Sequence, residues 1–177
     1  MIRTRVGYTG GTKLNPTYHD LGDHSETVQL DFDPSVITYE ELLQVFFASH
    51  DPTRSGVRCQ YKSAIFFHSA EQERLAQEAK AQEEARLGKA IQTDIAAATE
   101  FYLAEDYHQK YALQADKAMM QEYGSMYPEL GDIVDSTSAT RVNAYLYGLG
   151  DLEQLQRELD SLGLSEESRK RLLSTLD

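Results

Sequence analysis

Two short segments near the start of the chain have the residue pattern of β-strands. In residues 26–32 the apolar side chains of Val28, Leu30 and Phe32 fall on one face of an extended chain, and polar side chains fall on the other. This alternation predicts a half-buried strand. Residues 2–8 mix β-branched and aromatic types and stop at a pair of glycines, which predicts a second strand.

Helix signals follow the strands. Thr38 with Glu41 three residues later has the pattern of a capping box, which opens a helix that ends before Asp51 and Pro52. Ser69 begins a long polar helix that Gly88 closes near Leu87. Further segments are predicted as strands at 61–67 and 91–95, and as helices at Ala104–Gln121, 138–147, 151–162 and after Ser165.

The order of these elements, β-β-α-β-α-β-α, indicates an α+β fold with a mixed sheet and helices on one side. It corresponds to a ferredoxin-like plait that lacks its first β-α unit, followed by a helical C-terminal tail. We expect one domain over residues 1–123 and a helical extension over 124–177 packed on it. A role of this acidic, amphipathic tail in docking a partner is the alternative.

Composition and charge narrow the function classes. The chain has 177 residues and a formal net charge of −12, with 17 Lys and Arg against 29 Asp and Glu. Nucleic acid is an unfavourable partner because phosphate binding needs clustered basic residues. No apolar run approaches the roughly 18 residues of a membrane span, and residues 1–6 lack a stretch of signal-peptide length. We therefore expect a cytoplasmic monomer that binds neither nucleic acid nor membrane.

The few potential metal ligands do not form a recognisable site. Cys59 is the only cysteine, so the chain has neither an internal disulfide nor a multi-cysteine metal site. His24, His50 and His108 lie on separate predicted elements, without a spacing such as His-Glu-x-x-His. We expect solvated or capping histidines and no metal.

Several blocks in a fixed order resemble the peptide methionine-S-sulfoxide reductases of the A type. They extend over roughly residues 3–113, and each is weak alone. The blocks are Val6-Gly7-Tyr8-Thr9-Gly10-Gly11, Asn15-Pro16-Thr17-Tyr18, His24-Ser25-Glu26-Thr27-Val28, Phe32-Asp33-Pro34, His50-Asp51-Pro52-Thr53, Gln60-Tyr61-Lys62-Ser63-Ala64-Ile65-Phe66 and Ala104-Glu105-Asp106-Tyr107-His108-Gln109.

The resemblance implies reduction of the S-epimer of methionine sulfoxide to methionine in oxidised proteins or peptides, and in the free amino acid as a further possibility. Glu26 matches the family's acid, which protonates the sulfoxide oxygen and which we expect aromatic walls to shield from water. Tyr18 and Tyr61 match two hydroxyls that orient this oxygen. No cofactor is implied, because thioredoxin or a small thiol supplies the electrons.

The family's nucleophilic cysteine lies in a Gly-Cys-Phe-Trp-Gly block that precedes all of these motifs. No such block and no Trp occur in these 177 residues, so we expect a truncated chain with weak or no turnover, whose natural product starts upstream. Other departures are Gly56 in place of a family acid, Cys59 in place of a Thr, and a shorter loop before His24. The shorter loop suggests a branch that relies on external thiols.

Two alternatives stay open. In the first, the chain is a non-catalytic family member that binds sulfoxide or methionine. In the second, Cys59 is a surrogate nucleophile. If residues 59–61 are extended, Cys59 and Tyr61 share one face, and Arg58 with Lys62 favours the thiolate. Each of these residues also has an interpretation without a functional role. Glu26 is then an exposed charge at the edge of the sheet, and Cys59 is a small apolar packing residue. Tyr18 and Tyr61 are then packing residues as well.

Overall fold

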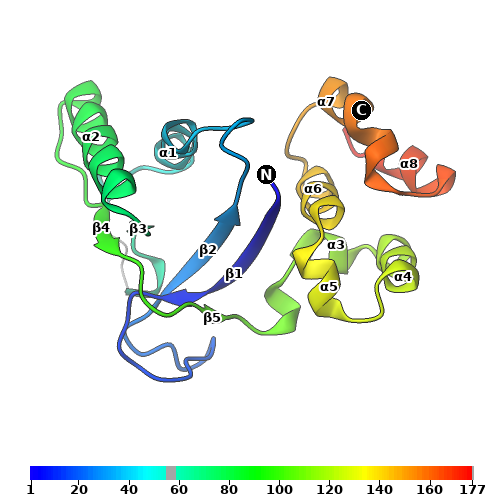
Figure 1. The fold of residues 1–177 in the computed structure, drawn as a ribbon, viewed down its shortest axis with the longest axis horizontal. Helices are drawn as coiled ribbons and strands as arrows, with labels where there is room; N and C mark the ends of the chain where they lie inside the picture. The colour runs from blue at the N-terminus through cyan, green and yellow to red at the C-terminus, as the bar shows by residue number, and fades with distance from the viewer. Residues whose placement is uncertain (55–58, 177) are drawn as a thin grey trace. The chain divides into compact units, whose positions relative to one another are not determined.

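The computed structural model describes residues 1–54 and 59–176, with the side chain of Cys59 outside the description. The chain forms two compact units (Figure 1). We call residues 7–27 and 33–104 the strand–helix unit, and residues 1–6, 28–32 and 105–177 the helical unit. Their boundary crosses the first two strands, so each strand belongs to both units. The division predicted at residue 123 stays a prediction.

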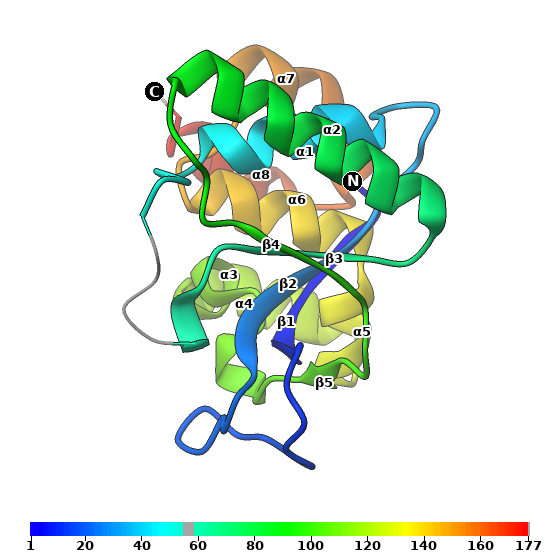
Figure 2. The ribbon, with the colours of Figure 1, turned by 90° about the vertical axis from the view of Figure 1, so that its left-hand side faces the viewer.

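In the part of the chain that the structure describes, five strands form two small sheets. Strands β1 (Arg3–Thr9), β2 (Ser25–Asp31) and β5 (Tyr102–Leu103) make one sheet in the order β2-β1-β5, with β1 and β5 antiparallel. Strands β3 (Ala64–Phe67) and β4 (Asp94–Ala97) form a parallel pair (Figure 2). The mixed α+β class is therefore confirmed. The predicted strand at 61–67 was too long, because Tyr61 ends a 3₁₀ turn, η1 (Cys59–Tyr61), and residues 62 and 63 are irregular.

The helices of the strand–helix unit begin and end close to the predicted residues. Helix α1 (Tyr39–Ala48) has the capping box of Thr38 and Glu41. Helix α2 (Ala70–Leu87) is capped by Ser69 and closed by Gly88 at a left-handed φ of 63°. The two helices lie side by side (Figure 1), and α2 packs on β3 and β4. The core of the unit consists of Leu43, Phe47, Ile65, Ala76 and Ile91.

Strand β2 corrects the expectation of a buried apolar face. Val28 is 53% exposed and Leu30 is 36% exposed, whereas Gln29 and Asp31 are partly buried. The reason lies in charge pairing within the helical unit. Asp31 accepts hydrogen bonds from Arg3 and Arg5, and these arginines also pair with Asp135 on α5 (Leu130–Asp135). This pairing draws the polar face of the strand inward.

The single helix predicted over Ala104–Gln121 is wrong. The segment forms a 3₁₀ turn, η2 (Asp106–His108), and two helices, α3 (Tyr111–Ala115) and α4 (Lys117–Met126). Lys110 interrupts it with a left-handed φ of 47°, and Asp116 caps α4 through the N–H groups of Ala118 and Met119. The tail is helical as expected, in α6 (Thr137–Leu146), α7 (Leu152–Glu158), η3 (Leu159–Leu162) and α8 (Glu166–Leu173).

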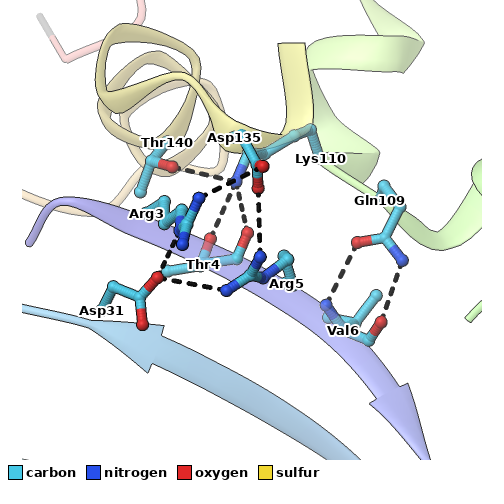
Figure 3. Close-up of polar contacts among 9 residues, drawn as sticks. All are labelled: Arg3, Thr4, Arg5, Val6, Asp31, Gln109, Lys110, Asp135 and Thr140. Atoms are coloured by element: carbon cyan, nitrogen blue, oxygen red, sulfur yellow. Dashed lines mark hydrogen bonds and ion pairs between the residues drawn. The ribbon is translucent and has the colours of Figure 1, made fainter. Parts of the chain in front are cut away.

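The helical unit has its own apolar core and a polar anchor on β1. The core consists of Leu113, Met119, Tyr123, Ile133, Ala139, Val142, Tyr145, Leu155, Leu162, Leu164 and Leu172. In the anchor, the amide of Gln109 bonds both the N–H and the C=O of Val6, at 3.1 and 2.9 Å. Lys110 Nζ donates to the C=O and hydroxyl of Thr4 and to the hydroxyl of Thr140, at 2.6, 3.0 and 2.9 Å (Figure 3).

Candidate active site

The loop between β1 and β2 is fixed by a carboxylate. Asp23 accepts hydrogen bonds from the N–H and hydroxyl of Thr12 and from the N–H of Lys13, at 2.8–3.2 Å. These donors favour the charged form, and they lower the pKa of Asp23 to about 2. Gly11 is required at the start of the loop, since a Cβ there would lie 2.6 Å from an oxygen of Asp23. The loop is thus held by its own side chains.

His24 closes this loop from inside. Its imidazole is buried, with 1% of the residue exposed, and packs edge-on against Tyr102. The N–H of Gly11 donates to Nδ1 at 3.2 Å, and Nε2 lies 2.8 Å from the C=O of Lys13. Because a carbonyl only accepts, these contacts define the neutral tautomer that carries its proton on Nε2. His24 therefore joins both ends of the loop that contains Tyr18.

Tyr18 lies at the far end of this loop, within the short bridge between Thr17 and Asp20. Its side chain is half-buried, and its ring packs edge-on against His19 at a centroid distance of 5.3 Å. An ion pair between Lys13 and Asp20 joins the two arms of the loop. Tyr18 thus lies in a segment that is held by the bridge between Thr17 and Asp20 and by the ion pair of Asp20.

Glu26 is the second residue of β2, immediately after the buried pair His24 and Ser25. Its side chain is exposed. The expectation that aromatic walls shield Glu26 from water is therefore wrong for the described residues. The reason is the strand alternation, which places Ser25 inward and the next side chain outward.

Gln60 connects Glu26 with the third predicted site residue. The side-chain amide of Gln60 donates to Oε1 of Glu26. Tyr61 follows directly in the same 3₁₀ turn, and 58% of the residue is exposed. The structure therefore brings Glu26 to the turn that carries Tyr61, although the two residues are 35 positions apart. Gln60 belongs to one of the motifs that carry the resemblance, but the sequence predicted no role for its side chain.

The segment after this turn is anchored by a chain of side chains. Ser63 Oγ lies 2.8 Å from His50 Nε2 and 2.8 Å from the hydroxyl of Thr93, which is buried. His50 Nδ1 lies 2.9 Å from the C=O of Phe46 at the end of α1. This arrangement makes His50 a helix-capping histidine, as predicted. It also ties the residues beside Tyr61 to α1.

Cys59 stands in a turn and not in a strand. The premise of an extended backbone over residues 59–61 is therefore wrong. Gly56 and Arg58 lie outside the described residues. Among the residues that the structure describes, no three His, Cys, Asp or Glu side chains are grouped to hold a metal ion.

Comparison with known proteins defines the class of this α+β chain. The family model for peptide methionine sulfoxide reductases matches residues 1–135. The chain belongs to the peptide methionine sulfoxide reductase family. The match covers Tyr18, Glu26 and Tyr61, together with Gln109 and Lys110 of the anchor.

Individual relatives extend the similarity to the tail. A peptide methionine sulfoxide reductase of Drosophila melanogaster is 40% identical over 96% of this chain, which covers 69% of that protein. Peptide methionine sulfoxide reductase A5 of Arabidopsis thaliana is 40% identical over 91% of this chain, and the match spans 65% of its length. The chain thus spans about two thirds of the length of these relatives.

Solved structures support the same assignment. The reduced form of Mxr1 from Saccharomyces cerevisiae matches with a TM-score of 0.58 at 32% identity, over 64% of this chain and 70% of that chain. Methionine sulfoxide reductase A of Corynebacterium diphtheriae matches with a TM-score of 0.55 at 35% identity, over 63% and 62%. Among the described residues, no helix is long and apolar enough to cross a membrane.

Proposed function

We propose that this chain recognises methionine-S-sulfoxide in oxidised proteins or peptides and takes part in its reduction to methionine. The observation that carries the proposal is the hydrogen bond from Gln60 to Glu26, which brings the turn of Tyr61 to the acid within one compact unit. In this account Glu26 gives a proton to the sulfoxide oxygen. Tyr18 and Tyr61 donate hydrogen bonds to the same oxygen.

Reduction of the sulfoxide also needs two electrons and two protons. Two thiols supply two electrons and two protons, so that the sulfoxide becomes a sulfide, the oxygen leaves as water and a disulfide forms. The oxygen leaves only when protonated, which is the role of Glu26. The exposed position of Glu26 allows a peptide to approach it.

Thioredoxin or a small thiol is the proposed reductant. Mxr1, which this chain resembles, has also been solved in complex with Trx2. The 177 residues contain one cysteine, Cys59, and no Gly-Cys-Phe-Trp-Gly block. We therefore propose that these residues alone have weak or no turnover. The cytoplasmic location and the monomeric state stay predictions.

A sulfoxide-binding role without catalysis is the second candidate, because the exposed Glu26 and Tyr61 could bind a polar S=O group without a nucleophile. Cys59 as a surrogate nucleophile is the third. One experiment tests all three and separates the surrogate nucleophile from the other two. Binding of a methionine-S-sulfoxide peptide to the 177-residue chain is measured by titration, and the methionine formed from this peptide in the presence of dithiothreitol is measured beside a thiol blank.

The expected result is saturable binding of the peptide with methionine formation close to the blank. Turnover that Cys59→Ser abolishes would instead establish the surrogate nucleophile. Turnover that survives this substitution would contradict a cysteine mechanism altogether. Failure of the peptide to bind would contradict both the reductase proposal and the binding candidate.

A further inference from the structure

Glu26 is held by a neutral amide. The side-chain nitrogen of Gln60 donates to Oε1 of Glu26. A carboxylate has only acceptor atoms, so the amide must present its N–H and not its oxygen. Gln60 is partly buried, whereas Glu26 is exposed. The contact therefore holds an otherwise mobile carboxylate at one orientation.

The choice of an amide has a chemical consequence. Because Oε1 accepts the bond from Gln60, the second oxygen of Glu26 is the one that can carry a proton and meet a sulfoxide oxygen. A Lys or Arg at this position would bind the carboxylate as an ion pair and oppose its protonation. An amide orients the group without adding a charge.

The turn that carries Gln60 has a firm base. Ser63 follows three residues later, and its hydroxyl contacts His50 and Thr93, each at 2.8 Å. The C=O of Ser63 accepts the N–H of Asp94 at 3.0 Å. These bonds connect the turn to the end of α1 and to the start of β4. The position of Gln60 is therefore set by the fold of the strand–helix unit and not by Glu26 alone.

We propose that Gln60 is a positioning residue that selects which oxygen of Glu26 serves the sulfoxide, and that it acts only through Glu26. This inference rests on the proposed function. It predicts two effects. First, the NMR resonance of the Gln60 side-chain amide depends on the carboxylate of Glu26. Second, removal of the amide weakens binding of the S=O group but not of the thioether.

The first test is an NMR measurement that requires no ligand. The side-chain N–H resonance of Gln60 is compared in the wild-type chain, in Glu26→Gln and in Glu40→Gln, an exposed acid on α1. We expect the resonance to move in Glu26→Gln and to stay in place in Glu40→Gln. A resonance that is unchanged in Glu26→Gln would overturn the proposal.

The second test is a double-mutant cycle on binding. Affinities for a methionine-S-sulfoxide peptide and for its methionine counterpart are measured in the wild type, Gln60→Leu, Glu26→Ala and the double variant. Gln60→Leu should lower sulfoxide affinity about tenfold, the equivalent of one hydrogen bond to a charged group, and leave methionine affinity unchanged. Gln44→Leu, at an exposed position of α1, is the matched control.

The double variant decides between positioning and a general structural role. If Gln60 acts through Glu26, the double variant binds sulfoxide as weakly as Glu26→Ala alone. A further tenfold loss in the double variant, or an equal loss for both peptides in Gln60→Leu, would overturn the proposal. Absence of sulfoxide binding by the wild type would contradict the proposed function, and the NMR comparison would then judge the Gln60–Glu26 contact independently.

Discussion

Two polar clusters of the chain differ in exposure. In the helical unit, Gln109 and Lys110 are buried, and their side-chain groups are used within the fold. In the strand–helix unit, Glu26 and Tyr61 are exposed, and Gln60 contacts one oxygen of Glu26. Buried polar groups must be matched inside the protein, since water cannot replace a lost partner. The buried cluster therefore serves stability, and the exposed one contains the groups that we propose for substrate binding.

Gln109→Leu should have the largest effect on stability. The amide of Gln109 bonds both backbone groups of Val6, and the leucine would leave this donor and acceptor unmatched. We expect a loss of about 4 kcal/mol in the free energy of unfolding, because each unmatched buried group costs about 1–3 kcal/mol. Urea denaturation measures this change. Gln121→Leu, an exposed position of α4, is the control and should stay within about 0.5 kcal/mol. A loss below about 1 kcal/mol in Gln109→Leu would contradict the stabilising role of the buried cluster.

The second prediction concerns pH. Burial lowers the pKa of Lys110 from 10.5 to about 8, with Asp135 opposing this shift and Arg5 adding to it. Between about pH 8 and 10.5 the unfolded chain keeps a proton that the folded chain has released. The unfolded state thus binds more protons, and the free energy of unfolding should rise with pH in this window, by roughly 2–3 kcal/mol.

Denaturation curves across this pH window, for the wild type and for Lys110→Met, measure the contribution of Lys110. The rise should be present in the wild type and absent from the variant. Lys117→Met, an exposed lysine of α4, should keep the rise. A parallel dependence in the wild type and Lys110→Met would show that Lys110 does not titrate in this range.

The third prediction addresses the loop of Tyr18. His24→Ala removes the buried imidazole that joins Gly11 to Lys13. We expect a loss of about 2 kcal/mol, together with faster amide exchange at Gly11, because its N–H loses its acceptor. His68→Ala, at an exposed position before α2, should change neither quantity. Unchanged exchange at Gly11 in His24→Ala would argue that the loop is held without the histidine.

The smallest stability effect is expected at the proposed acid. Glu26→Gln should alter the free energy of unfolding by less than about 0.5 kcal/mol, because the side chain is exposed. In Glu26→Ala, which removes the group that we propose donates to the sulfoxide oxygen, binding of methionine-S-sulfoxide should weaken about tenfold. Denaturation of the first variant and calorimetric titration of the second test these statements. A stability loss above about 1 kcal/mol would place Glu26 with the buried cluster.

Local signals predicted much of the fold. The caps at Thr38 and Ser69 and the closing Gly88 were confirmed because their effect depends on neighbouring residues alone. The break at Lys110 could not be predicted, since the segment has helical spacing and a tertiary contact decides its backbone. The exposed apolar face of β2 was missed for the same reason, because Asp31 is drawn inward by arginines on another strand.

The candidate site was also predictable only as far as local sequence signals reach. Its residue types came from the resemblance, which named Tyr18, Glu26 and Tyr61 without locating them in space. The contact from Gln60 to Glu26 joins positions 34 residues apart, so no spacing rule could have indicated it. The strand predicted over 61–67 began three residues too early, because Tyr61 ends the turn η1 and β3 begins at Ala64.

The most direct test of the central claim is a comparison of the two epimers of methionine sulfoxide. Calorimetric titration of the 177-residue chain with matched peptides that contain the S- or the R-sulfoxide gives both affinities without any need for turnover. An acid and hydroxyls that meet the sulfoxide oxygen from a fixed direction predict at least about tenfold preference for the S-epimer. Equal affinity for the two epimers, or binding of neither, would contradict the assignment of this site to methionine-S-sulfoxide.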